Sequence, residues 1–424
     1  MLLTNIITIN SNTVVFLYNL SVRIYFLLIY IASLFNKKAK LWISGRKGIF
    51  EKIEKKVKKE DSIIWFHCAS LGEFEQGRPV IEKLKQNKKY KILLTFFSPS
   101  GYEVRKNYSG ADYVFYLPID TPANAKHFVS LINPKAVFFV KYEFWFNYIR
   151  EVKNSHIPFF VISANFRKNQ HFFAWYGTWF RKQLMGITHI FVQNKESKEL
   201  LNSAGIEQVT VSGDTRFDRV ADITKQVKDF PVIKKFCRGS EIFIAGSSWQ
   251  PDEEIITRLI NSEKTNYKFI IAPHMVDKPH IASLVDKIKK GHVVLYSEAD
   301  EDNVMYAKVL VIDCIGILSH VYQYGKIAYI GGGFGNGIHN ILEAATFGMP
   351  VIFGPKYHKF REAIDLIKVG GAFSISNEAG LMNIVLKLCN EPDYLKQTAQ
   401  IAKNFVQSNI GASNIILKET EKYF

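Results

Sequence analysis

The sequence contains little cysteine, and none of it is arranged in pairs. Four cysteines, Cys68, Cys237, Cys314 and Cys389, are spread over 424 residues without a C-x-x-C pair. This spacing fits neither a disulfide framework nor a zinc site. It is typical of reduced, buried thiols in a protein that faces the cytosol. The cysteines therefore indicate a reduced chain.

Acidic residues are scarce relative to basic ones. The chain has 39 Asp and Glu against 55 Lys and Arg, a formal net charge of +16. A charge of this size implies an anionic partner, which could be nucleic acid, a membrane surface or a phosphorylated substrate. No nucleic-acid recognition motif accompanies the charge, which gathers beside an apolar segment, so we expect no nucleic acid as partner.

The common nucleotide-binding motifs are missing from the most glycine-rich segment, residues 326–355. G-x-G-x-x-G fails when counted from Gly331, because the sixth position is Asn336, and from Gly333, because it is Ile338. No G-K-[ST] follows the glycines, which excludes a Walker phosphate loop.

The same segment nevertheless has the pattern of a strand, a glycine turn, a helix and a second strand. The apolar run 327–330 predicts a buried strand, and five glycines between 331 and 337 permit positive φ. We expect a helix from about His339, whose N-terminus could bind a phosphate, with Glu343 placed to accept ribose hydroxyls. A nucleotide site is our hypothesis; a glycine turn without a ligand is the alternative.

A long apolar run lies near the N-terminus. Residues 14–35 are rich in Val, Leu, Ile, Phe and Tyr, and their length matches the roughly 20 residues that span a bilayer. Arg23 near the middle is costly in hydrocarbon, which leaves an interfacial helix or a buried core helix as alternatives. No small-residue cleavage site of a signal peptide follows. We expect residues 1–44 to be a membrane-anchor segment.

Basic residues follow this apolar run directly. Ten of them occur between positions 37 and 59, against two acidic residues, Glu51 and Glu54. Such a flank favours the cytoplasmic side and binds anionic lipid headgroups. The ten are Lys37, Lys38, Lys40, Arg46, Lys47, Lys52, Lys55, Lys56, Lys58 and Lys59.

The rest of the chain alternates strands with helices in two runs, which predicts parallel sheets with helices on both faces. We expect two Rossmann-like domains, 45–220 and 239–424, that face a cleft and are joined by a polar linker, 221–238. The last helix could pack back on the first domain. The predicted strands are 62–67, 91–95, 136–140, 159–162, 189–192, 208–211, 241–245, 267–272, 292–296, 309–312, 327–330 and 349–353.

Charged side chains follow three predicted strands of the first domain, at the sheet edge where ligands bind. Glu73 could deprotonate an acceptor hydroxyl, or could merely complement a helix dipole. Lys141 and Arg216 could bind a carboxylate or a phosphate, or could be solvated or salt-bridged.

Metal-ligand patterns are not evident. His67, His274 and His339 are scattered rather than at ligand spacing. The D-x-D sequence at 300–302 resembles the metal motif of some sugar transferases, but it lies in a polar run that is typical of a solvated turn. We expect no metal.

Taken together, these segments resemble the 3-deoxy-D-manno-octulosonic acid (Kdo) transferases of lipopolysaccharide synthesis. The resemblance spans nearly the whole chain and lies in the order and spacing of several motifs. These are a hydrophobic N-terminus followed by Gly45-Arg46-Lys47, His67-x-x-Ser70-x-Gly72-Glu73, Glu143-x-Trp145, Gly213-x-x-Arg216-Phe217-Asp218 and His339-Asn340-x-x-Glu343.

The resemblance implies a GT-B fold, with the acceptor on the N-terminal domain and CMP-Kdo on the C-terminal domain. The acceptor would be the lipid A precursor, lipid IVA, at the cytoplasmic side of the inner membrane. Glu73 would be the general base of an inverting transfer, Lys141 and Arg216 would stabilise charge, and no metal would be required. Donor contacts would come from Pro273, His274, Ile315, Gly316, Ile317, Asn340, Ile341, Leu342 and Glu343.

The chain departs from the family pattern at three places. Many relatives have an acidic residue where Lys141 stands, and they often read Pro-Arg-His where this chain has Pro273-His274-Met275. Their Met-Gly-Glu is Ile315-Gly316-Ile317 here, so backbone contacts must replace side-chain ones. The alternatives are a GT-B transferase that uses a UDP-sugar and a non-catalytic protein that binds a membrane surface.

Overall fold

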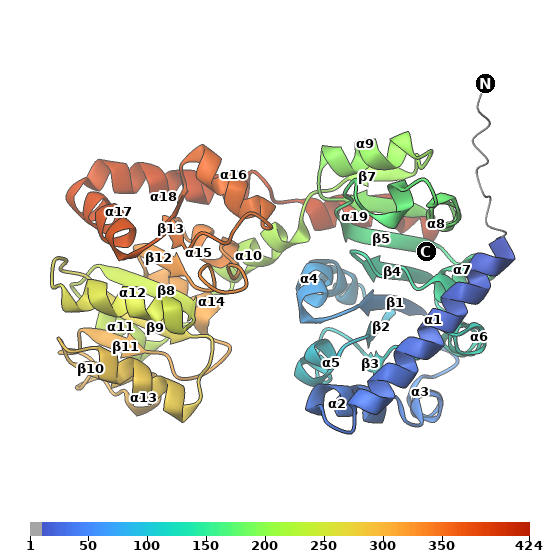
Figure 1. The fold of residues 1–424 in the computed structure, drawn as a ribbon, viewed down its shortest axis with the longest axis horizontal. Coiled ribbons are helices and arrows are strands. Elements are labelled where there is room, and N and C mark those ends of the chain that lie inside the picture. Colours follow the sequence, from blue (N-terminus) through green and yellow to red (C-terminus); the bar gives the residue numbers. More distant parts are fainter. Residues whose placement is uncertain (1–10) are drawn as a thin grey trace. The chain divides into compact units, whose positions relative to one another are not determined.

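The computed structural model describes residues 11–424, and the chain forms two compact units. The first unit contains the chain up to residue 219 together with 411–424, and the second contains 220–410. In each unit a sheet is covered by helices on both faces (Figure 1). Residues 1–10 of the expected anchor segment lie outside the described residues.

The first unit is built on a sheet of seven parallel strands in the order β3-β2-β1-β4-β5-β6-β7. Its central strands are continuous apolar runs because both faces are covered. In β1, Ile63 and Trp65 enter one core and Ile64 and Phe66 the other. The strands are β1 Ile63–Cys68, β2 Lys91–Phe96, β3 Tyr113–Tyr116, β4 Ala136–Val140, β5 Phe159–Ala164, β6 His189–Val192 and β7 Val209–Val211.

Helices of this unit begin at residues suited to cap them. The side chains of Ser70, Thr121 and Asn194 each accept a hydrogen bond from a backbone N–H of the following first turn. The helices are α1 Ser11–Ala32, α2 Lys37–Arg46, α3 Ile49–Lys56, α4 Leu71–Gln86, α5 Pro99–Arg105, α6 Pro122–Ile132, α7 Phe146–Asn154, α8 Thr178–Leu184, α9 Lys195–Ser203 and α19 Ala412–Thr420. Helix α10 Thr215–Lys225 begins in the first unit and continues into the second.

The second unit has its own parallel sheet of seven strands, in the order β10-β11-β9-β8-β12-β13-β14. The strands are β8 Ile242–Ser248, β9 Lys268–Pro273, β10 Val293–Leu295, β11 Val309–Val311, β12 Ile327–Ile330, β13 Val351–Phe353 and β14 Ala372–Ser374. The helices are α11 Pro231–Cys237, α12 Gln250–Asn261, α13 Lys278–Lys287, α14 Leu318–Val321, α15 Leu342–Ala345, α16 Arg361–Val369, α17 Glu378–Asn390 and α18 Pro392–Gln407.

Residues 221–238, expected to be a linker, contain helical structure instead. They form the end of α10 and the whole of α11, and Ile233 and Phe236 are fully buried. The lysines around these apolar positions concealed the helical pattern. The chain re-enters the first unit at residue 411, where both carboxylate oxygens of Asp218 accept backbone hydrogen bonds, from Gly411 and Ser413 at 2.6 Å each.

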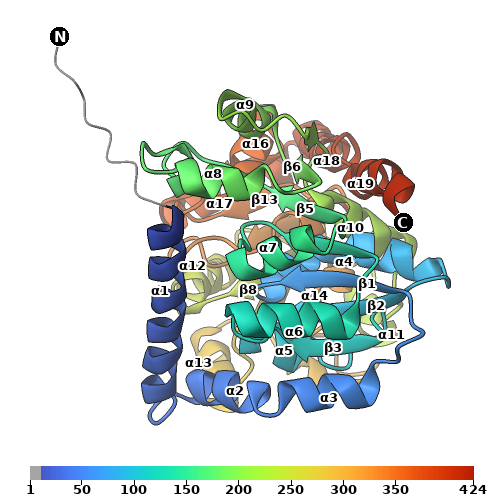
Figure 2. The same cartoon turned by 90° about the vertical axis from the view of Figure 1, so that its right-hand side faces the viewer.

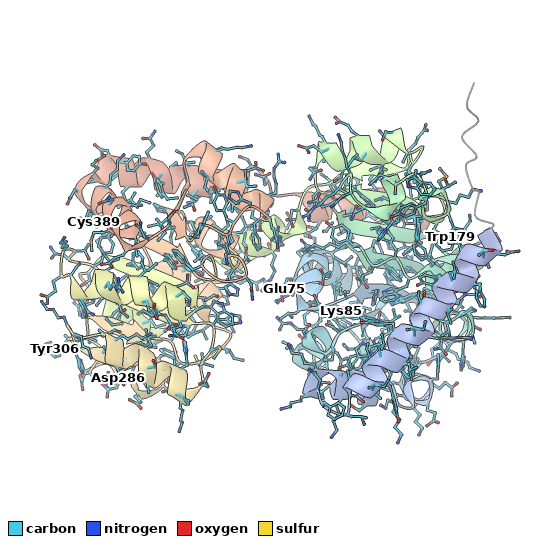
Figure 3. The ribbon with its side chains drawn as sticks, in the orientation of Figure 1. Glu75, Lys85, Trp179, Asp286, Tyr306 and Cys389 are labelled. Atoms are coloured by element: carbon cyan, nitrogen blue, oxygen red, sulfur yellow. The ribbon has the colours of Figure 1, made fainter. Side chains whose placement is uncertain are left out.

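Helix α1 lies along the first unit (Figure 2). Tyr18 packs against Phe146 with ring centroids 5.1 Å apart, and Val22 is buried. Trp179, labelled in Figure 3, also contacts Tyr18. The helix is long and apolar enough to cross a membrane, and it exposes Phe16, Leu17, Leu20, Ile24, Leu27, Leu28 and Ile31.

Arg46 is buried, and the prediction that it belongs to the exposed basic flank is wrong. Its guanidinium donates to the carbonyls of Trp42, Phe97 and Leu117 at 2.7–3.0 Å and lies 3.8 Å from the centre of the Trp42 ring. Burial lowers the pKa of Arg46 to about 9. A Cβ on Gly45 would lie 2.2 Å from the Tyr116 ring, so only glycine allows this approach. Gly45 and Arg46 therefore hold α2 against the sheet.

Candidate functional site

In each sheet, two adjacent strands are followed by connections that run in opposite directions along the sheet. In the first unit this point of divergence lies between β1 and β4, and in the second it lies between β8 and β12. The loops that leave such a strand pair diverge, and open α/β sheets bind ligands in the crevice they form. Polar side chains of both units gather at these two points.

Glu73 lies at the point between β1 and β4, on the first turn of α4. Its carboxylate accepts a hydrogen bond from Ser70 and lies 3.8 Å from the Lys141 ammonium. Lys141 directly follows β4 and has a φ of 64°, a value that is uncommon outside glycine and that clusters at functional sites. The structure therefore brings together two of the predicted catalytic residues.

Glu75, only two residues further on, has a different environment. It lies on α4 (Figure 3) and forms ion pairs with Arg78, Arg105 and Arg219 at 2.9–3.8 Å. Glu75 therefore joins α4 to its neighbours, and Glu73 is the carboxylate at the ends of the strands.

A second polar chain runs beside Glu73. The fully buried His67 places Nε2 3.3 Å from Glu143, and the same carboxylate oxygen accepts the indole N–H of Trp145 at 2.7 Å. Helix α7 begins at Phe146, so Glu143 lies in the loop after β4. These contacts hold residues 141–145 at the sheet edge.

Arg216 is already engaged within its own loop. Its guanidinium donates to one oxygen of Asp214 at 2.6 and 2.9 Å, and its backbone N–H donates to the other oxygen at 2.9 Å. The pair lies at the start of α10. Arg216 thus has the salt bridge that was the alternative to an anion site.

Three aromatic rings gather at the point between β8 and β12 in the second unit. Trp249 donates its indole N–H to Nε2 of His339 at 2.9 Å, and their rings are within 9° of parallel. His274 stacks on both rings, with centroids 4.4 Å from Trp249 and 4.6 Å from His339. Burial lowers the pKa of His339, and His274 lowers it further, which favours the neutral acceptor ring.

Asp252 holds this group in place, and the sequence analysis did not single it out. Its buried carboxylate accepts hydrogen bonds from the Tyr329 hydroxyl and from the backbone N–H groups of Trp249 and Gly332, at 2.7–2.9 Å. A carboxylate at the third position of a helix, three residues after the N-cap Trp249, is the signal that was available, because an acidic residue at that position caps a helix. Trp249 was missed as well.

The glycines at 331–337 serve backbone packing. A Cβ on Gly331 would lie 2.3 Å from the Ser247 carbonyl, and one on Gly333 would lie 2.5 Å from the Gly354 nitrogen. The helix expected from His339 begins only at Leu342 and is four residues long. The Asn340 side chain accepts a hydrogen bond from the Leu342 N–H and donates one to Glu343, each at 3.1 Å.

The remaining predicted donor residues differ in exposure. Pro273 ends β9, and the side chains of Ile341 and Leu342 are fully buried, which leaves only backbone atoms for a ligand. Ile315 is 82% exposed, and Gly316 has a φ of 93°, in the loop after β11. Ile317 is the N-cap of α14. Within residues 11–424, no group of three His, Cys, Asp or Glu side chains is arranged to hold a metal ion.

Comparisons with known proteins identify the family of this chain. A family model of the 3-deoxy-D-manno-octulosonic-acid transferases (kdotransferases) matches residues 43–219. A 3-deoxy-D-manno-octulosonic acid transferase of Aquifex aeolicus is 30% identical over 340 residues, which cover 78% of this chain and 88% of the relative. The chain belongs to the Kdo transferase family. A Haemophilus influenzae Kdo transferase is 25% identical, over 85% of this chain and 87% of the relative.

Solved structures show the same fold class. The UDP-GlcNAc 2-epimerase of Neisseria meningitidis matches with a TM-score of 0.59 at 18% identity, over 85% of this chain and all of that one. MurG of Acinetobacter baumannii matches with a TM-score of 0.54 at 12% identity, over 85% and 99%. This Kdo transferase family member is therefore a glycosyltransferase of the GT-B type, as the sequence predicted.

Proposed function

We propose that this enzyme transfers Kdo from CMP-Kdo to a hydroxyl of the lipid A precursor, lipid IVA, with inversion. The observation that carries the proposal is the Glu73 carboxylate, held by Ser70 and paired with Lys141 at the end of β4. It occurs in a chain whose relatives are named Kdo transferases.

In the proposed reaction Glu73 accepts the proton of the acceptor hydroxyl. The freed oxygen forms a bond to the anomeric carbon of Kdo from the face opposite CMP. The bond from that carbon to the phosphate oxygen breaks, and its electrons leave with CMP. Lys141 and Arg216 are proposed to supply positive charge for the carboxylate and phosphate of the donor, with Arg216 exchanging its Asp214 partner for the donor anion, and such cations would take the place of a metal.

The second unit is proposed to hold the donor. Glu343 offers carboxylate oxygens to the ribose hydroxyls, and Asn340 orients it at 3.1 Å. The backbone at Pro273, Gly316 and 341–342 is proposed to bind the cytidine and the phosphate. The partly exposed ring of Trp249 adds a surface on which a base can stack.

Helix α1 is proposed to lie in the surface of the inner membrane, on its cytoplasmic side. Near its middle, Tyr18 bonds to Asp120, and Asn147 donates to Asn19 at 2.9 Å. A helix surrounded by hydrocarbon could not keep these contacts with the first unit. The opposite face exposes mostly apolar side chains together with Arg23, and α2 and α3 add lysines for anionic headgroups.

Mass analysis of the products tests the proposal. Purified enzyme with CMP-Kdo and lipid IVA should add Kdo, and activity should persist in chelator. Glu73→Gln should lower turnover about 10²- to 10⁴-fold, the usual contribution of a general base. Glu82→Gln on the same helix is the control and should retain activity. Near wild-type transfer by Glu73→Gln would refute the role of Glu73.

Calorimetry separates the proposal from a UDP-sugar enzyme. The Glu73→Gln change lies outside the proposed donor site, so the variant should still bind CMP. It should bind CMP more tightly than UDP. If the protein bound UDP more tightly than CMP and transferred a sugar from UDP to a lipid acceptor, Kdo would not be the transferred sugar.

A further inference from the structure

The first unit contains an apolar pocket between α1, α2 and the loops that follow β2 and β4. Its volume is about 420 Å³, within the roughly 300–1,000 Å³ of small-ligand pockets. Its walls include Val22, Tyr25, Trp42, Phe97, Ile119 and Trp145. The pocket lies wholly within the first unit, whereas the proposed donor residues belong to the second unit.

Aromatic rings in contact with one another make most of the wall. Phe97 contacts Trp145 at 4.6 Å, Trp42 at 5.5 Å and Tyr25 at 6.1 Å between ring centroids. Asp120 also borders the pocket, but its carboxylate is occupied by Tyr18 and by backbone N–H groups. The pocket thus offers a ligand mainly apolar surface, which suits hydrocarbon.

One buried polar atom of the wall has no protein partner. Trp42 is 4% exposed, and its indole N–H forms no hydrogen bond within the described part of the chain. A buried donor without an acceptor costs free energy, which a ligand oxygen can recover. The carbonyl of an acyl linkage has such an oxygen.

The pocket is also linked to the proposed catalytic edge. Trp145 in its wall donates to Glu143, and Glu143 contacts His67 at the end of β1. The loop 141–145 therefore carries both a wall of the pocket and Lys141, which pairs with Glu73. On the other side, the helix that closes the pocket exposes its apolar outer face.

We propose that this pocket binds an acyl chain of the lipid acceptor and thereby holds the acceptor sugar near Glu73. The inference rests on the proposed function and adds the site that recognises the lipid part of the substrate. Its occupant is a chain of the acceptor itself and not of the surrounding phospholipid, because the pocket adjoins the loop that carries Lys141.

Two acceptors test the site: lipid IVA and its deacylated sugar bisphosphate. Ile119→Trp should fill the pocket and raise KM for lipid IVA at least tenfold while leaving transfer to the deacylated acceptor within about twofold. Trp42→Phe should raise KM for lipid IVA several-fold. The control Ile24→Trp, on the exposed face of α1, should change neither. Equal effects of Ile119→Trp on both acceptors, or no effect on either, would overturn the proposal.

Tryptophan quenching distinguishes the source of the chain and does not need turnover. A lipid IVA analogue with brominated acyl chains should quench fluorescence more than brominated phospholipid at the same mole fraction, and Trp42→Phe should reduce the difference. Equal quenching by both lipids would assign the pocket to bulk phospholipid and overturn the proposal. Absence of transfer to either acceptor by the wild type would instead remove the proposed function.

Discussion

The indole N–H of Trp249 donates to Nε2 of His339 over 2.9 Å, and this contact sets the protonation of the histidine. An indole nitrogen can only donate, so Nε2 must be the unprotonated nitrogen and Nδ1 must carry the proton. Burial and the neighbouring His274 both lower the pKa of His339, which favours the neutral ring. Trp249 thus makes His339 a hydrogen-bond donor through Nδ1.

Replacing Trp249 tests whether this donor contributes to nucleotide binding. Trp249→Phe keeps a ring for His274 but removes the N–H that selects the tautomer. We expect KM for CMP-Kdo to rise about tenfold, the equivalent of a hydrogen bond of roughly 1–1.5 kcal/mol, with a smaller change in kcat. Steady-state kinetics measure this, and Trp175→Phe, at a side chain that is 78% exposed, is the control. An unchanged KM would place His339 outside the donor site.

Removing Asp252 should destabilise the second unit. Asp252→Ala leaves the Tyr329 hydroxyl and the N–H groups of Trp249 and Gly332 without their acceptor. At about 1–3 kcal/mol for each buried unsatisfied donor, we expect a loss of at least 3 kcal/mol. Thermal unfolding of the full chain measures it. Asp286→Ala on the exposed surface of α13 (Figure 3) is the control, and equal melting temperatures would contradict the prediction.

Asp120 should make the stability of the first unit depend on pH. Burial raises its pKa to about 6, although the hydrogen bonds from Tyr18, Asn147 and Tyr148 act in the opposite direction. The folded state therefore binds the proton more tightly than the unfolded state, whose pKa is about 3.9. The stabilisation is complete below about pH 4 and is lost as the pH rises through about 6.

We expect wild-type stability, relative to Asp120→Asn, to fall by about 3 kcal/mol between pH 4 and pH 7, since each pKa unit corresponds to roughly 1.4 kcal/mol. Urea unfolding at several pH values measures the difference. Because asparagine does not titrate, the two curves should converge or cross as the pH rises. Parallel curves would show that Asp120 does not titrate in this range.

Arg46 cannot be replaced by lysine without loss. The planar guanidinium donates to three backbone carbonyls from one position, whereas an ammonium reaches fewer of them and stacks less well on Trp42. We expect Arg46→Lys to lower stability by about 2 kcal/mol and to increase proteolysis within α2. The control is Lys47→Arg, at the exposed neighbouring residue. Resistance to proteolysis equal to that of the wild type would mean that α2 is held by its apolar contacts alone.

The strands were largely predictable because buried parallel strands are continuous apolar runs. The predicted strand 136–140 coincides with β4, and 327–330 coincides with β12. The strands Tyr113–Tyr116 and Ala372–Ser374 were not predicted because they are short and lie at sheet edges, where a covered apolar run is not needed. Sequence patterns reveal a strand through its burial, and these two strands are only partly buried.

The site was predictable only where it follows from sheet geometry. Glu73 and Lys141 come together because each follows the end of one of two adjacent parallel strands. The contact of Trp249 with His339 joins residues far apart in the chain and depends on side-chain directions, which no local pattern contains. The burial of Arg46 was hidden for the same reason, since in sequence it is one basic residue among many.

Asp218, Gly411 and Ser413 tie together the two points at which the chain leaves and re-enters the first unit. The second unit is thus an insertion between two neighbouring anchor points. During synthesis on the ribosome, residues 220–410 emerge complete before 411–424 are available. The inserted unit can therefore finish folding before the first unit acquires residues 411–424.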